Sequence, residues 1–156
     1  MWPLFNWLGE RSNCDLANAS FESHVCKANG VPFNRFHRDA LHMDFLWDET
    51  LRQQHHNLKN CIETYLGIET TPFAEASQGK DFDVALRENA EVAIKYAALD
   101  PLGTTLVCDI LQDYLEKRPA REGYNSWELY ERWERPFQQT HIHMEQAGDP
   151  INRAEV

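Results

Sequence analysis

Four histidines lie among acidic and aromatic residues within positions 36–61, and clustered imidazoles are typical of metal sites and of proton transfer. They are His37, His42, His55 and His56. Residues that hold one ion from a single α-helix should be three or four positions apart, because each residue turns the helix by about 100°. None of these four is spaced in that way. We therefore expect His42 and His56 to be solvated on the side of a helix, away from its apolar face.

Carboxylates beside this cluster support an alternative interpretation, a metal-binding helical bundle with redox or acid–base chemistry. Asp44 and Asp48 are four positions apart, which places both carboxylates on one face of a helix. The remaining ligands would come from the last helix, if the two helices lie side by side. The candidate set is Asp44, Asp48, His55, His141 and Glu145. An ordinary ion pair between Asp48 and Arg52 explains one flank equally well, and the chain contains no Glu-x-x-His pair, so we assign no metal and no cofactor.

The helix that carries the histidine cluster is the longest that the sequence predicts. Residues 36–66 contain no Gly or Pro, and their apolar residues recur at spacings of three, four and seven. Gly67 stands where a C-cap is expected. We therefore expect one helix over residues 37–66, about 45 Å long at 1.5 Å per residue.

Further amphipathic patterns follow this helix along the chain. Asp100-Pro101 predicts a boundary between two helices, because Pro lacks a backbone donor and favours a first turn. Asn125 and Glu128 predict a capping box at the start of the last helix. No run of alternating apolar residues indicates a strand. We expect an all-α, single-domain bundle over residues 1–156, with four main helices at about 37–66, 82–99, 101–118 and 126–146.

The N-terminal segment, residues 1–35, is predicted to be irregular or short-helical and to pack on the bundle or extend from it. A short helix within it should close at Asn29-Gly30, with Leu16 and Val25 facing inward.

Composition narrows the function classes. The chain has 156 residues and a net charge of −10, from 25 acidic and 15 basic residues. That charge argues against nucleic acid as a partner, because affinity for phosphate backbones comes largely from Lys and Arg. No apolar run is long enough to span a bilayer. The four cysteines form no C-x-x-C pair and the N-terminus lacks a signal-peptide pattern, so we expect a reduced, cytoplasmic protein.

Aromatic residues exceed what the apolar helix faces can bury. Phe45 and Leu46 point away from the face led by Trp47, and the N-terminal tip is apolar before its first charge at Glu10. Because aromatic side chains dominate protein interfaces, we predict a protein-binding surface there. Its residues are Trp2, Phe5, Trp7, Phe45 and Leu46.

The sequence contains no phosphate-binding glycine loop and no nucleophile elbow, which favours a role without catalysis. We therefore expect a small acidic protein-binding protein, such as an adaptor, an inhibitor, an immunity-type protein or an assembly subunit. Its partner would be another protein. A basic surface on that partner would favour association, because the acidic surface of this chain attracts it. The length of the helix predicted over residues 37–66 is also compatible with a homodimer.

Overall fold

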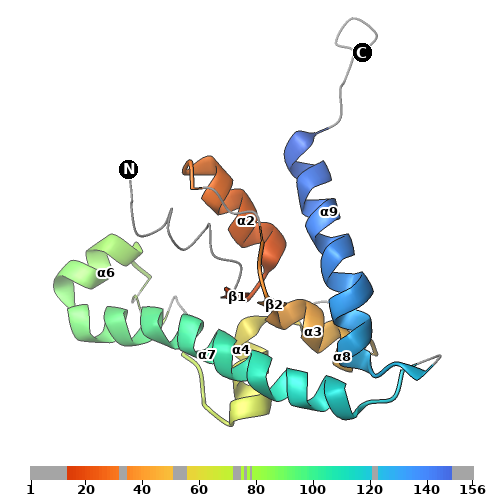
Figure 1. Ribbon diagram of the computed structural model, residues 1–156. Helices are drawn as coiled ribbons and strands as arrows, with labels where there is room; N and C mark the ends of the chain where they lie inside the picture. The colour runs from red at the N-terminus through yellow and green to blue at the C-terminus, as the bar shows by residue number, and fades with distance from the viewer. Residues whose placement is uncertain are drawn as a thin grey trace, which may run out of the picture.

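Helices make up most of the computed structural model, which describes residues 14–31, 35–50, 56–71, 75, 77, 79–120 and 123–148 (Figure 1). This confirms the all-α fold class. Within that part of the chain, the strands are β1 (Asp15–Leu16) and β2 (Arg38–Asp39), which pair in parallel with Asp15 opposite Arg38. None of the helices in the described ranges combines the length and the apolarity that crossing a bilayer requires.

The first helix in the described part of the chain, α2 (Ala19–Ala28), has Asn18 as its N-cap, whose side chain accepts a hydrogen bond from the Phe21 amide at 3.1 Å. It ends beside Gly30, which has a φ of 67°. The predicted end of this helix is therefore correct. The predicted inward position of Val25 is wrong, because its side chain is 44% exposed. Leu16 is buried as predicted, but it belongs to strand β1 and not to a helix.

The single helix predicted over residues 37–66 is wrong. The structure has α3 (Ala40–Trp47), then α4 (Leu58–Cys61) continued by the π-helical turn η2 (Ile62–Leu66). Side-chain hydrogen bonds to the backbone end one helix and start the next: the Thr50 amide donates to Asp48 Oδ1 at 3.0 Å, and the Asn60 amide donates to Asn57 Oδ1 at 3.0 Å. Such local bonds compete with helix continuation.

The boundary predicted at Asp100-Pro101 is also wrong. Helix α6 (Phe82–Glu88) ends at Asn89, and α7 (Ala90–Lys117) then runs through Pro101 without a break. Asn89 has φ −145° and ψ 75°, outside the helical region, and its side chain accepts from the Val92 amide at 3.4 Å. The asparagine, and not the proline, therefore separates the two helices.

The last helical run contains α8 (Ser126–Leu129), the π-helical turn η4 (Tyr130–Glu134) and α9 (Arg135–Ala147). Its predicted capping box is present, since the Glu128 amide donates to Asn125 Oδ1 at 2.8 Å and the Asn125 amide to Glu128 Oε2 at 3.0 Å. The π-helical turn ends two positions before Pro136, which lacks the backbone donor that a regular α-helical bond needs. The predicted span of 126–146 is thus confirmed, although the run is not regular throughout.

The core lies along α7, which crosses the lower part of Figure 1. Helix α3, turn η2 and the start of the last run all pack on it, through fully buried side chains. These are Met43, Ile62, Val107, Cys108, Leu111, Leu115 and Tyr130. Gly103 of α7 permits a close approach of η2, because a Cβ there would lie 2.4 Å from Ile62 Cδ1. The packing of α3 on α7 brings the C-terminal ends of these two helices together, where Arg118 donates to the carbonyls of Leu46 and Trp47.

Candidate functional site

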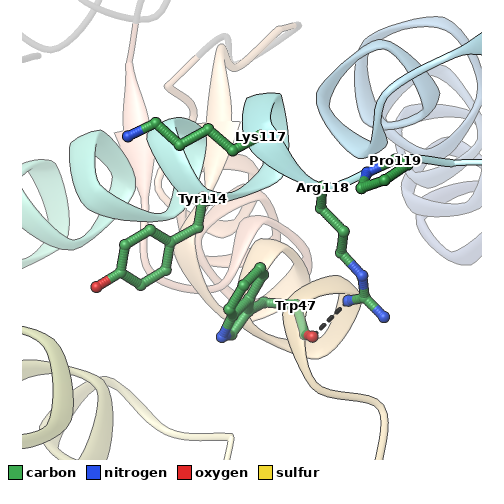
Figure 2. A pocket seen from close by; sticks show the side chains of 5 residues that line it. All are labelled: Trp47, Tyr114, Lys117, Arg118 and Pro119. Atoms are coloured by element: carbon green, nitrogen blue, oxygen red, sulfur yellow. Dashed lines mark hydrogen bonds between the residues drawn. The ribbon is translucent and has the colours of Figure 1, made fainter.

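A surface hollow of about 390 Å³ lies where the C-terminal end of α3 meets that of α7 (Figure 2). We call it the aromatic–basic groove. It is lined by Trp47, Tyr114, Lys117, Arg118 and Pro119. The combination of flat rings and cationic groups distinguishes it from the acidic surface that the composition indicates.

Two aromatic rings form one wall of the groove. The ring centroids of Trp47 and Tyr114 are 5.0 Å apart and the rings are inclined at 41°. Tyr65 of η2 packs edge-on against Tyr114, with the ring centroids 6.1 Å apart. Tyr114 is 37% exposed and Trp47 is half-buried, so the wall is fixed by packing and still accessible.

Arg118 fixes the other side of the groove. Its Nη1 donates to the backbone oxygens of Leu46 at 2.7 Å and of Trp47 at 2.5 Å, and its guanidinium carbon lies 5.6 Å from the centre of the Trp47 ring. Those carbonyls are among the last four of α3 and have no partner within the helix. Arg118 therefore caps α3 and holds the Trp47 ring through a cation–π contact.

Lys117 supplies a second cation, which is free to change partner. Its Nζ lies 2.5 Å from Asp113 Oδ2, one turn earlier on α7, and the two side chains are 72% and 53% exposed. Exposed ion pairs of this kind contribute little net free energy, because water and salt screen them. The Lys117 side chain runs along α7 with its ammonium directed away from Trp47 (Figure 2), so an anion at the rim of the groove can take the place of Asp113.

Behind the aromatic wall lies a buried polar cluster centred on Asp44. His56 Nδ1 is 2.6 Å from Asp44 Oδ2, and Tyr65 donates its hydroxyl to Asp44 Oδ1 at 2.5 Å. Burial, followed by the hydrogen bond to Asp44, raises the pKa of Tyr65. Burial, followed by the charge of Asp44, also raises the pKa of Cys61. Both groups thus stay protonated near neutral pH, and Cys61 is no nucleophile.

The predicted surface position of His56 is wrong, because its side chain is only 6% exposed. Helix α3 ends at Trp47 and His56 lies outside a helix, so the helical geometry assumed for His56 does not apply. His42 is also less solvated than expected: its side chain is 25% exposed, with Nε2 3.2 Å from Glu134 Oε2. The contact between His56 and Asp44 could not be predicted from residue spacing, since twelve positions separate the two residues.

The candidate metal ligands do not converge. Asp44 is occupied by His56 and Tyr65, while Asp48 accepts from the amide and hydroxyl of Thr50. His141 lies 3.7 Å from Glu145 on α9 as a helical pair. His55 falls outside the described residues. Within the part of the chain that the structure describes, no three His, Cys, Asp or Glu side chains are grouped so that they could hold an ion.

The predicted protein interface is only partly visible. Phe45 is 47% exposed, with its ring centroid 5.5 Å from that of His56. Leu46 is half-buried and packs against the core beside Trp47. Trp2, Phe5 and Trp7 lie outside the described residues. A role of these five residues in binding stays a prediction.

Of the comparisons with known proteins, the one with curated sequences finds relatives of this chain. No protein-family model matches the chain, and no solved structure matches it. DNA polymerase I B, mitochondrial, of Oryza sativa subsp. japonica is 27% identical over 168 aligned positions, which cover 88% of this chain and 16% of that protein. DNA polymerase I A, chloroplastic/mitochondrial, of Arabidopsis thaliana is 26% identical over 171 positions, which cover 87% and 16%. The chain spans about a sixth of the length of the curated relatives it matches.

These relatives correct two expectations. A non-catalytic adaptor, inhibitor or assembly subunit, with a metal-binding bundle as the alternative, is the wrong class, because the matched proteins are DNA polymerases. The expectation against nucleic acid is wrong for the same reason. That expectation assumed that the net charge of −10 describes every part of the surface, although the basic residues Lys117 and Arg118 are adjacent at one end of α7. The cytoplasmic location and the single-domain organisation stay predictions.

Proposed function

We propose that this chain is a DNA-contacting helical part of a DNA polymerase I-type protein. The observation that supports this most strongly is the extent of the similarity, which covers 87–88% of the chain in each of four DNA polymerase I proteins. A match of that extent involves the succession of helices and their connections. A shared amphipathic pattern in one helix would be far shorter.

The aromatic–basic groove is the surface of this chain best suited to that role. Cationic side chains neutralise phosphates, and aromatic rings accept bases of any sequence by stacking. Acidic residues repel phosphate, and Asp113 lies beside the groove itself, so the contact with DNA is confined to Lys117 and Arg118 at the end of α7. The contact is therefore local, and it does not require a basic protein.

Titration of the complete chain into fluorescently labelled DNA tests the proposal. Anisotropy should rise at low ionic strength and the affinity should fall as salt is added, because binding releases counterions. Replacing Lys117 by Ala should weaken binding and reduce the slope of log K against log salt by about one.

Lys95 offers a matched control on the same helix. It is 76% exposed and lies 3.0 Å from Glu91, as Lys117 is 72% exposed and pairs with Asp113. Lys95→Ala removes the same charge far from the groove and should leave the affinity unchanged. If neither single-stranded nor duplex DNA binds at low salt, the proposed function is wrong.

A further inference from the structure

The groove has the size and the lining of a site for one ring system. Its volume of about 390 Å³ is near the lower end of the range for small-molecule sites, roughly 300 to 1,000 Å³. The Trp47 and Tyr114 rings already touch each other, so an entering ring stacks against the wall they form and does not insert between them. A duplex keeps its bases paired and stacked, which leaves their faces unavailable to such a wall.

We propose that the aromatic–basic groove binds one unpaired nucleotide of single-stranded DNA, with its base on the Trp47–Tyr114 wall and its phosphate at Lys117. This inference rests on the proposed function and specifies the form of DNA that the site takes. It predicts a preference for single strands over duplexes, because base stacking adds to the phosphate contact only in the former.

Each lining residue has a distinct role in this arrangement. Tyr114, as the more exposed ring, contacts the base directly. Lys117 exchanges the Asp113 carboxylate for a phosphate oxygen. Arg118 is a positioning residue, because its guanidinium is committed to the carbonyls of Leu46 and Trp47 and to the Trp47 ring.

The charges around the groove favour a phosphodiester over a nucleoside triphosphate. Among the residues lining the hollow, Lys117 is the cation whose head group is not held by backbone carbonyls. One ammonium group matches the single charge of a phosphodiester, whereas a triphosphate brings several charges close to Asp113. A chain of nucleotides also adds contacts beyond the groove.

The test compares three labelled oligonucleotides bound by the complete 156-residue chain: a single strand, the same sequence as a duplex, and a single strand of abasic sites. We expect the single strand to bind about tenfold more tightly than either of the others. The abasic strand keeps the phosphates and lacks the bases, so it isolates the contribution of stacking.

Two variants then locate the site. Tyr114→Leu keeps an apolar side chain and removes the ring, and should weaken single-strand binding about tenfold with little effect on the abasic strand. Phe137→Leu is its control, because Phe137 is an aromatic residue on α9 that is 69% exposed. Arg118→Lys should weaken single-strand binding while the abasic strand is unaffected, since it disturbs Trp47 and leaves Lys117 in place. Circular dichroism verifies that each variant is folded.

The outcomes separate the two proposals. Equal affinity for single strand and duplex, or a Tyr114→Leu variant that binds like the unaltered chain, overturns the single-strand site and leaves DNA binding intact. Absence of binding to all three oligonucleotides overturns the proposed function itself.

Discussion

His56 Nδ1 lies 2.6 Å from Asp44 Oδ2, and the two side chains are only 6% and 4% exposed. Tyr65 donates to the other oxygen of the same carboxylate at 2.5 Å. Asp44 thereby joins α3, the segment just before α4, and η2. The contact therefore holds His56 against α3, and Tyr65 links this cluster to the Tyr114 ring of the aromatic–basic groove.

Replacing His56 by Ala should therefore lower the free energy of unfolding by about 3 kcal/mol, since it leaves a buried carboxylate without one of its partners. Urea denaturation measures the loss. His42→Ala is the control: its side chain is 25% exposed and contacts Glu134, so we expect less than about 1 kcal/mol. Equal losses in the two variants would show that the buried contact contributes no more to stability than the more exposed one.

Stability should also fall in alkali because of two buried thiols. Burial raises the pKa of Cys61 and of Cys108 above the ordinary value of 9.0, and the charges of Asp44 and Asp15 respectively add to it. The folded state then holds protons that the unfolded state releases. The stabilisation is complete below pH 9 and is lost as pH rises from there towards the folded-state values, with a slope of at most about 2.7 kcal/mol per pH unit for two thiols.

Urea denaturation at a series of pH values between 8 and 11 measures this slope. Cys61→Ala and Cys108→Ala should each make it shallower, whatever their effect at pH 8. A slope that is unchanged in both variants would assign the alkaline loss to other groups, such as the buried Tyr130, whose pKa is also raised by burial.

Gly103 should resist substitution although it lies within a helix, where Ala is normally favoured by about 1 kcal/mol. A Cβ at this position would lie 2.4 Å from Ile62 Cδ1 and 2.8 Å from Ile62 Cγ1. We expect Gly103→Ala to destabilise the protein by roughly 1 to 3 kcal/mol through overpacking. Adding Ile62→Val, which deletes Cδ1, should recover part of that loss in thermal or urea unfolding. A double variant less stable than the sum of the single changes would contradict this.

Capping signals in the sequence predicted helix ends correctly, whereas the boundary at Asp100-Pro101 and the single long helix were wrong. Gly67 caps its helix with φ 65°, and the Asn125–Glu128 capping box forms as expected, because these features depend on neighbouring residues. The single long helix was wrong because Trp47 and Leu58 both pack towards the core from separate helices. The spacing of apolar residues alone does not indicate the break between these two helices.

The candidate site could not be predicted from the sequence, because it is formed by residues that are far apart along the chain. Trp47 and Tyr114 are 67 positions apart, and only the packing of α3 on α7 brings their rings to 5.0 Å. Each aromatic residue fits an ordinary core position when its own helix is considered. The signal available in the sequence was the pair Lys117-Arg118 at the end of a predicted helix, next to Pro119, and the net charge concealed it.

The pairing of Lys117 with Asp113 leads to the last prediction, which concerns DNA affinity. If Asp113 competes with phosphate for the Lys117 ammonium, then Asp113→Asn should strengthen binding of single-stranded DNA about threefold to fivefold at low salt. The estimate corresponds to about 1 kcal/mol between charges about 4 Å apart in water, and the gain should shrink as salt is added.

Glu91→Gln is the matched control for this prediction, because Glu91 stands to Lys95 as Asp113 stands to Lys117. It changes the net charge by the same amount on the same helix and should leave the affinity nearly unchanged. Anisotropy titrations of both variants against one labelled strand make the comparison. An equal gain in both would mean that overall charge, and not the groove, governs the affinity, because only a local competition distinguishes the two carboxylates.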